Sequence, residues 1–133
     1  MDTFSLFVFL CMILSALLQP PTASISSHVL DISNGEPAEG VTILAFVEST
    51  QGWLQIGNQT TTSDGRVPWV SPNHQLTVAN YKLQFLTGDY FGRRNQSTFY
   101  PYVEVVFSVT DSARHNHVPL TLSPYGYSTY RGS

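Results

Sequence analysis

From residue 28 onward the sequence alternates short runs of β-forming residues with turn signals, and this repetition restricts the fold more than any other feature. A short run rich in Val, Ile, Thr, Tyr and Phe, bounded by Gly, Pro, Asn, Asp or Ser, is typical of a strand. Such runs occupy residues 28–32, 41–49, 53–61, 80–86, 102–109, 115–123 and 125–130. No window of a dozen residues keeps a helical period, so we expect at most one short helix, over residues 87–95. The pattern predicts an all-β sandwich.

The start of the chain has a different composition. Residues 4–18, FSLFVFLCMILSALL, form a nearly unbroken apolar run that is short for a membrane span but typical of a signal-peptide core. Small residues follow it. We therefore predict a secretory signal peptide over residues 1–23, cleaved after Ala23 or Ser24, and one domain over residues 24–133 that is secreted without a membrane anchor. Asp2 and the lack of Lys or Arg before the run argue for the alternatives, an uncleaved anchor or an unusual transcript start.

The chemistry expected of the cysteine and of the glycosylation sequons depends on whether the leader is removed and the chain is secreted. The only cysteine, Cys11, lies inside the predicted leader, so the domain would have no disulfide, Cys nucleophile or Cys-based metal site. The sequons at Asn58 and Asn95 become glycan acceptors if the chain enters the secretory route, and are otherwise unmodified polar turns.

The charge distribution disfavours nucleic acid as a partner. The net charge is −3, and the six Lys and Arg residues are scattered, with only Arg93 and Arg94 adjacent. Binding to a phosphate backbone needs a basic patch, which this chain does not offer. With 42% hydrophobic and 11% charged residues, the chain is expected to fold into a globular domain rather than remain disordered.

Side chains alternate between the two faces of a strand, and this alternation separates core residues from polar ones. In residues 115–123, Val118, Leu120 and Leu122 share one face, which we assign to the core. Faces that need not be core carry His28, His115, His117, Ser128 and Tyr130. If these faces coincide, they form a polar surface that can do chemistry.

Three groups of candidate residues follow from this surface. His115 and His117 are spaced to bind one metal ion if His28 supplies a third ligand, although surface or interface histidines and metal-free general acid–base catalysis are the alternatives. Arg66 follows the Ser-Asp-Gly turn, where it is either solvated or holds a carbonyl or an anionic ring with its planar guanidinium. His74 lies among loop residues and is interpreted as exposed. The chain has no G-x-S-x-G, phosphate-binding Gly loop, dinucleotide fingerprint or H-E-x-x-H.

Four segments carry a family resemblance: HVLDISNGEPAEGV, SDGRV, FYPYVEVVF and the closing HNHVPLTLSPYGYSTYRGS. Together they resemble the 5-hydroxyisourate hydrolases, transthyretin-related enzymes of urate degradation. The resemblance implies a transthyretin-like sandwich of two four-stranded antiparallel sheets with one short helix. It also implies a homotetramer, built as a dimer of dimers, with active sites in a channel between the dimers.

The resemblance implies an activity and a set of site residues. The family opens the six-membered ring of 5-hydroxyisourate to give 2-oxo-4-hydroxy-4-carboxy-5-ureidoimidazoline, with no metal and no cofactor. Carried over by motif, the catalytic residues are His28, Arg66, His117 and Ser133, and the substrate-binding residues are His28, Arg66 and Tyr130. The residues do not say which histidine is the general base. The alternative function is a secreted transthyretin-like carrier of thyroid hormone or another small aromatic ligand in the channel.

The compartment implied by the resemblance differs from that implied by the leader. Many eukaryotic relatives look peroxisomal, whereas this chain shows neither an R-L-x5-H-L type address nor a C-terminal S-K-L. We therefore expect the secretory pathway, with the peroxisome as the alternative.

Overall fold

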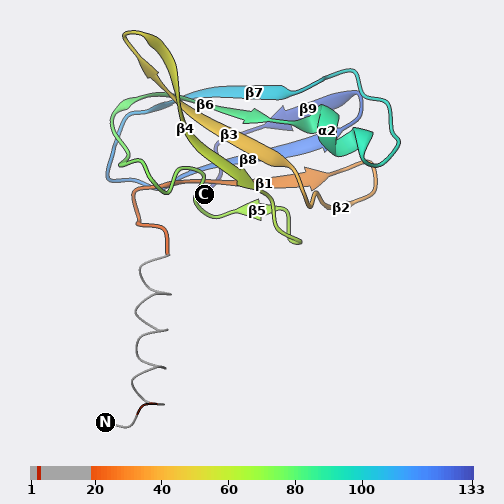
Figure 1. Cartoon of the computed structure of the whole chain (residues 1–133), viewed down its shortest axis with the longest axis horizontal. Coiled ribbons are helices and arrows are strands. Elements are labelled where there is room, and N and C mark those ends of the chain that lie inside the picture. The colour runs from red at the N-terminus through yellow and green to blue at the C-terminus, as the bar shows by residue number, and fades with distance from the viewer. Residues whose placement is uncertain (1–2, 4–18) are drawn as a thin grey trace.

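The computed structural model describes residue 3 and residues 19–133, so the core of the predicted leader, residues 4–18, lies outside the described residues. Two β-sheets face each other in a sandwich, and one short helix closes one end (Figure 1). None of the helices in the described residues has the length and hydropathy needed to cross a membrane.

Each sheet has its own strand order. The first runs β2-β1-β8-β9, with β5 also paired to β1, and the second runs β4-β3-β6-β7. The strands of the first sheet are β1 (Ile25–Asp31), β2 (Glu36–Pro37), β5 (Arg66–Val67), β8 (Asn116–Ser123) and β9 (Gly126–Thr129). Those of the second are β3 (Thr42–Ser49), β4 (Gly52–Thr60), β6 (Ala79–Phe85) and β7 (Val103–Val109).

The all-β sandwich with one short helix that the sequence predicts is confirmed. Every predicted run forms a strand, and helix α2 (Thr87–Gly92) falls inside the range 87–95 where a helix is expected. The resemblance implies that both sheets are antiparallel, and this is wrong for one pair of strands. Strands β1 and β8 run parallel, whereas the other pairs run antiparallel. A parallel pair needs a long crossover connection, and here the strands of the second sheet lie between β1 and β8 in the sequence. The two-residue strand β2 extends the first sheet further.

The core lies between the inner faces of the two sheets. Residues such as Tyr81, Leu83 and Phe85 alternate with more exposed neighbours on β6, as a strand with one buried face requires. The predicted core residues Val118, Leu120 and Leu122 are buried on β8, which confirms that assignment.

The interpretation of His74 as exposed is wrong, because its ring is half-buried and bonded to a core residue. His74 Nε2 lies 3.0 Å from the hydroxyl oxygen of Tyr81, whose side chain is fully buried. A buried tyrosine hydroxyl needs a polar partner, and the loop that carries His74 supplies one. Burial lowers the pKa of His74.

A buried polar link fixes α2 against β1. Tyr90 on α2 donates a hydrogen bond of 2.8 Å to Oδ2 of Asp31, and both residues are about 1% exposed. Burial, followed by Asp31, raises the pKa of Tyr90 to about 12. The Arg94 guanidinium lies over the Tyr90 ring at 3.9 Å from its centroid, which is a local cation–π contact at the end of the helix. The hydrogen bond from Tyr90 to Asp31 is the polar link to β1.

Candidate active site

The face of the first sheet that points away from the core gathers the predicted site residues. In the register of the sheet, His28 on β1 is opposite Arg66 on β5, and Ser26 on β1 is opposite His117 on β8. Ser26 and His28 are two residues apart and therefore share a face, while the intervening Ser27 points inward and is 1% exposed. Three strands that are distant in the sequence thus bring these side chains together.

A hollow of about 330 Å³ opens beside these strands. Its lining includes Arg66, His117 and Ser133, which are predicted from separate motifs, together with Ser26, Ser27, Pro68, His115 and, from the predicted leader, Pro20. The predicted catalytic residues from the middle and the end of the chain therefore share one cavity, and His28 lies next to Arg66 in the sheet.

The ring of His117 is held from one side. The hydroxyl oxygen of Ser26 lies 2.7 Å from Nδ1 of His117, so this ring nitrogen is engaged. Within the described residues, Nε2 of His117 has no hydrogen-bond partner, so this nitrogen is available to bind a substrate. Burial, followed by the positive fields of His115, Arg66 and His28, lowers the pKa of His117. A neutral ring with an open nitrogen is suited to take a proton near pH 7.

The C-terminal segment forms part of this site. The amide of Gly132 donates a 2.9 Å hydrogen bond to the carbonyl oxygen of His117, which joins the segment to β8. A Cβ atom on Gly132 would lie 2.4 Å from Cδ2 of the His117 ring, so the backbone passes too close for any side chain there. The last residues are therefore placed by contact with His117 rather than left as a loose end.

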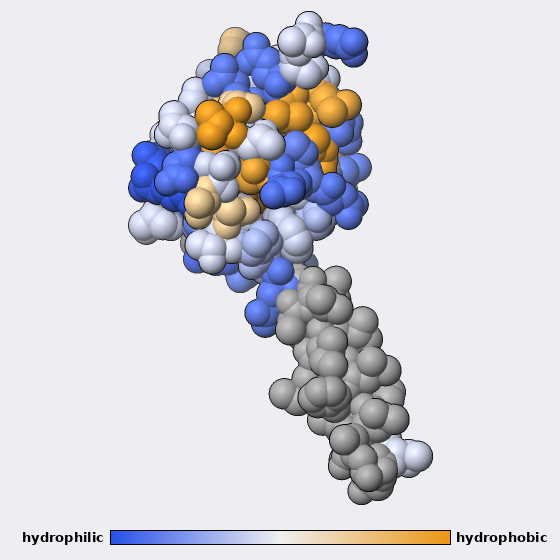
Figure 2. All heavy atoms as spheres, turned by 90° about the vertical axis from the view of Figure 1, so that its left-hand side faces the viewer, coloured by the Kyte–Doolittle hydropathy of each residue, from blue (hydrophilic) through white to orange (hydrophobic). Residues whose placement is uncertain are grey.

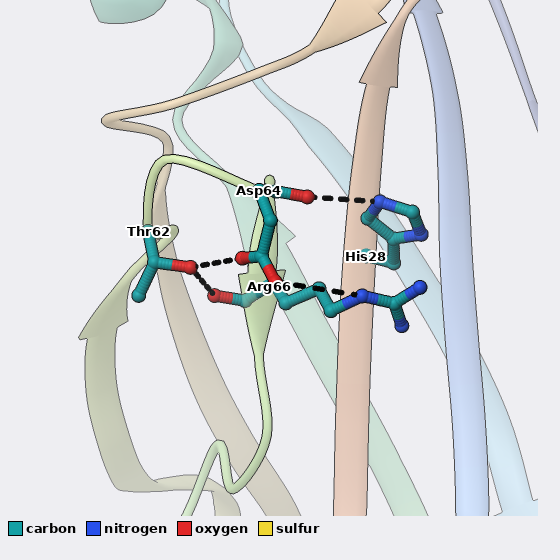
Figure 3. A network of polar contacts seen from close by, with 4 residues as sticks. All are labelled: His28, Thr62, Asp64 and Arg66. Atoms are coloured by element: carbon teal, nitrogen blue, oxygen red, sulfur yellow. Dashed lines mark hydrogen bonds and ion pairs between the residues drawn. The ribbon is translucent and has the colours of Figure 1, made fainter.

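The Ser-Asp-Gly turn holds Arg66 and His28 together (Figure 3). Nε2 of His28 lies 3.1 Å from the carbonyl oxygen of Asp64, and because a carbonyl can only accept, this nitrogen carries the proton. The Asp64 carboxylate accepts a hydrogen bond from the Thr62 hydroxyl and lies 3.8 Å from Nε of Arg66. The Thr62 hydrogen bond, followed by the backbone amide and the charge of Arg66, lowers the pKa of Asp64.

The geometry of this turn leaves two groups open to a ligand. With its Nε2 proton donated to Asp64, a neutral ring of His28 would keep a lone pair on Nδ1 for a ligand. The terminal nitrogens of Arg66 form no hydrogen bond within residues 19–133, so its planar fork can bind two oxygens. The ion pair with Asp64 is exposed, with side-chain exposures of 52% and 64%, and it orients Arg66 more than it stabilises the fold.

Tyr130 lies apart from the larger hollow. It is 62% exposed and lines a second hollow of about 170 Å³, together with His117, Thr129 and Arg131. The two hollows meet at His117, which lines both. The structure thus groups His28, Arg66, His117 and Ser133, with Tyr130 on the far side of His117.

The metal-site alternative does not match the geometry. Within the described residues, no three His, Cys, Asp or Glu side chains are placed to hold one ion. Nε2 of His28 is directed at Asp64, and the rings of His115 and His117 have their centroids 6.2 Å apart with Ser26 between them.

Ser26 is a site residue that no sequence motif singles out. It is two residues before His28 on the same strand, so strand alternation places it on the same face. Its contact with His117 depends on the parallel pairing of β1 with β8, which the sequence pattern does not reveal.

Comparison with known proteins gives a consistent result. Residues 25–132 match the model of the HIUase/Transthyretin family. The chain is 53% identical over 135 residues to a probable 5-hydroxyisourate hydrolase of Caenorhabditis elegans, covering 100% of both chains. It is 43% identical over 114 residues to the 5-hydroxyisourate hydrolase of Mus musculus, covering 84% of this chain and 97% of the mouse protein.

Solved structures of two kinds share the fold. The 5-hydroxyisourate hydrolase of Klebsiella pneumoniae superposes with a TM-score of 0.73 at 35% identity, covering 83% of this chain and 99% of that protein. A sea bream transthyretin in complex with thyroxine superposes with a TM-score of 0.76 at 27% identity, covering 81% and 93%. Hydrolases and transthyretins therefore share this backbone fold. The two kinds of protein have to be distinguished by the side chains on the outer face of the first sheet, which we call the polar face and which carries His28, Arg66 and His117 in this chain.

Proposed function

This chain belongs to the HIUase/transthyretin family, and from that premise we propose that it is a 5-hydroxyisourate hydrolase acting in urate degradation. One observation carries the proposal beyond the family match: Arg66, His117 and Ser133 line one hollow, and His117 presents an open, neutral ring nitrogen there. Ring opening by water needs a base for the water and positive charge for the carbonyl oxygen, and this hollow provides both.

We propose a role for each group, and the geometry supports it. His117 takes a proton from water through Nε2, because its Nδ1 is bonded to Ser26. The Arg66 fork binds the carbonyl oxygen under attack and offsets the negative charge that develops on it. His28 lies beside Arg66 and binds the substrate through Nδ1, since its Nε2 is bonded to the carbonyl of Asp64. Ser133 reaches the same hollow and positions the water or the ring of His117.

The test of the function is an assay of 5-hydroxyisourate decay, with the substrate generated in place by urate oxidase. The purified chain should accelerate the decay above its spontaneous rate. The variant His117→Asn should lose about 10²- to 10⁴-fold in kcat, the usual contribution of general acid–base catalysis. A fully active His117→Asn variant would remove His117 from the proposed mechanism, and no acceleration by the wild-type chain would overturn the function itself.

A charge-matched pair of variants tests Arg66. Arg66→Gln should reduce kcat/KM strongly because the oxyanion loses its positive partner. Arg114→Gln removes the same charge from an exposed residue outside the hollow and should leave the rate unchanged. Equal losses in both variants would indicate a general effect of net charge instead of a role for Arg66.

The assembly we propose is a homotetramer in which two dimers meet over the polar face. Each sheet has one edge strand, β9 in the first and β7 in the second, that carries an exposed hydrophobic side chain, with Val106 59% and Tyr127 42% exposed. Unpaired strand edges with such side chains favour pairing with a second copy. Light scattering should give four times the mass of one chain, and a monomer at assay concentration would contradict the proposal.

We propose that residues 1–23 direct the chain into the secretory pathway and are removed. This rests on the apolar run at residues 4–18 and on the position of β1, which begins at Ile25 and would be left intact by cleavage after Ala23 or Ser24. Expression in secreting eukaryotic cells should yield a protein in the medium that starts at Ser24 or Ile25. An intact N-terminus, or retention of the protein in peroxisomes, would contradict this.

A further inference from the structure

The Ser26 hydroxyl bridges the ring of His117, the proposed base, and the ring of His115. Its hydroxyl oxygen lies 2.7 Å from Nδ1 of His117 and 2.8 Å from Nε2 of His115. Ser26 is only 7% exposed, so its hydroxyl has little access to water and depends on these two partners. His117 is half-buried, whereas His115, one residue before β8 begins, is exposed. The Ser26 hydroxyl thus links the half-buried ring of His117 to the exposed ring of His115, and all three side chains line the hollow.

The hydroxyl allows two arrangements of protons along this line. A serine hydroxyl donates one hydrogen bond, so when it donates to one ring it can only accept from the other. If Ser26 donates to His115, Nδ1 of His117 carries a proton and Nε2 is a free base. If Ser26 donates to His117, Nε2 of His117 carries the proton and can act as an acid.

We propose that Ser26 and His115 form a proton relay behind His117, in the hydrolase reaction proposed above. When Nε2 of His117 takes a proton from the attacking water, the Nδ1 proton passes to Oγ of Ser26 and the Ser26 hydroxyl proton passes to Nε2 of His115. His117 is then neutral again with a proton on Nε2, and His115 carries the positive charge.

The second half of the reaction reverses these transfers. Nε2 of His117 gives its proton to the departing ring nitrogen, Ser26 returns a proton to Nδ1 of His117, and His115 returns one to Ser26. Each group ends as it began, and no proton is gained or lost. The relay thus lets one histidine act first as a base and then as an acid.

Charge explains why the relay is favourable. Within the site, the charged or titratable groups that face His117 are His28 from β1, Arg66 from β5, His115 just before β8, and Arg131 and the terminal carboxylate of Ser133 from residues 131–133. A positive charge held on His117 would be partly desolvated and repelled by Arg66. On His115 the same charge is exposed to water, which solvates it.

Ring-nitrogen NMR tests the hydrogen-bonded arrangement without any assay. With ¹⁵N-labelled histidine, wild-type His117 should show a protonated Nδ1 and a bare Nε2 at neutral pH. Ser26→Ala should lose this preference, and Ser26→Thr, which keeps the hydroxyl, should retain it. A His117 tautomer that is the same in wild type and Ser26→Ala would overturn the proposal.

Kinetics then separate a relay from a positioning contact. His115→Gln keeps an acceptor for the Ser26 hydroxyl but cannot take a proton, so it should preserve the His117 tautomer and still lower kcat by about tenfold or more, with KM changed less than about twofold. Ser26→Ala should lose about 100-fold in kcat, and Ser26→Thr should recover most of the wild-type rate. A His115→Gln variant with wild-type kcat would overturn the relay.

A solvent isotope experiment adds a readout that a structural role would not change. Rates measured across mixtures of H₂O and D₂O should curve for the wild type, because several protons move together, and become linear for His115→Gln. A linear wild-type response would contradict the relay. If the wild-type chain does not accelerate decay at all, the hydrolase proposal fails, and the NMR result still reports on Ser26 independently.

Discussion

At the scale of single residues, His117 has its properties set by groups that need not touch the substrate. Ser26 engages its Nδ1, Gly132 allows the C-terminal backbone to pass beside its ring, and burial, followed by nearby positive charges, lowers its pKa. A lone histidine on a strand would be an ordinary exposed side chain. The contacts behind the ring therefore make it a candidate base.

The close approach of Gly132 leads to a prediction. Gly132→Ala should push the His117 ring away, because the new Cβ would lie 2.4 Å from Cδ2, and misplacement of a reacting group by about 1 Å can cost about 10²-fold in rate. We expect a large loss in kcat with only a small loss of stability. Gly126→Ala is the matched control, since its nearest contact would be at 3.6 Å in the same hairpin. Equal kcat values for the two variants would contradict the proposed placement.

The lowered pKa of His117 predicts the pH dependence of catalysis. A general base works when it is deprotonated, so kcat/KM should be high above the pKa of His117 and fall as the pH drops through it. Burial, His115, Arg66 and His28 all lower this pKa from 6.5, which puts the midpoint of the acid limb below pH 6.5. Arg66→Gln removes one of these causes and should move the midpoint upward. A wild-type midpoint above pH 6.5 would contradict this assignment.

Sequence alone could place some of these residues but not their partners. Strand alternation correctly puts His28 and His117 on faces outside the core, because a period of two is a local property. The contact of Ser26 with His117 spans 91 positions and depends on how two distant strands align. The local sequence pattern does not show which strands pair, so the hydrogen bond from Ser26 to His117 could not be predicted from it.

At the scale of elements, the turn before β5 positions Arg66. Gly65 has a φ of +76°, a left-handed conformation that favours glycine, and its carbonyl oxygen accepts a 2.8 Å hydrogen bond from the amide of Val29. A Cβ atom on Gly65 would lie 2.4 Å from the carbonyl oxygen of Val29. The turn is therefore packed directly onto β1, and this contact aligns Arg66 with His28.

This packing predicts a stability difference between two glycines. Gly65→Ala should lose more than the about 1–3 kcal/mol expected for backbone strain alone, because it also displaces β1. Gly35→Ala is the matched control: its φ is +71°, but its Cβ would meet nothing within 4 Å. Urea denaturation of the two variants should show the larger drop in unfolding free energy for Gly65→Ala, and equal drops would refute the contact.

The elements themselves were largely predictable, and the exceptions have a common cause. Long alternating runs formed strands close to their predicted ranges because they carry strong local signals. Strands β2 and β5 have only two residues each, too few to show a period, and the parallel direction of β1 and β8 is a property of the whole chain path. The two short strands and the parallel pair are therefore seen only in the folded structure.

At the scale of the whole molecule, the fold does not decide between hydrolysis and ligand transport. Hydrolase and transthyretin structures superpose on this chain with similar TM-scores of 0.73 and 0.76. Hydrophobic patches also remain on the surface at one end of the sandwich, between hydrophilic residues (Figure 2). The polar face with His28, Arg66 and His117 carries the functional conclusion, as sites rather than folds determine chemistry.

The placement of Ser133 predicts how the molecule responds to an added tag. Six histidines fused after Ser133 would enter or cover the hollow that this residue lines, so kcat/KM should fall by about tenfold or more. The same tag inserted between Thr50 and Gln51, in the exposed turn that joins β3 and β4, should be tolerated. Full activity of the C-terminally tagged protein would argue against a site at Ser133.

The parallel pairing of β1 with β8 also has a consequence for how the protein is made. Ile25 pairs with Asn116, and Asp31 pairs with Leu122, so the first strand synthesised must wait for one of the last. Long-range pairing of this kind slows folding and leaves strand edges exposed in partly folded chains. On the ribosome, the proposed active site therefore cannot form until nearly the whole polypeptide has emerged, and until then the edge of β1 that pairs with β8 has no partner.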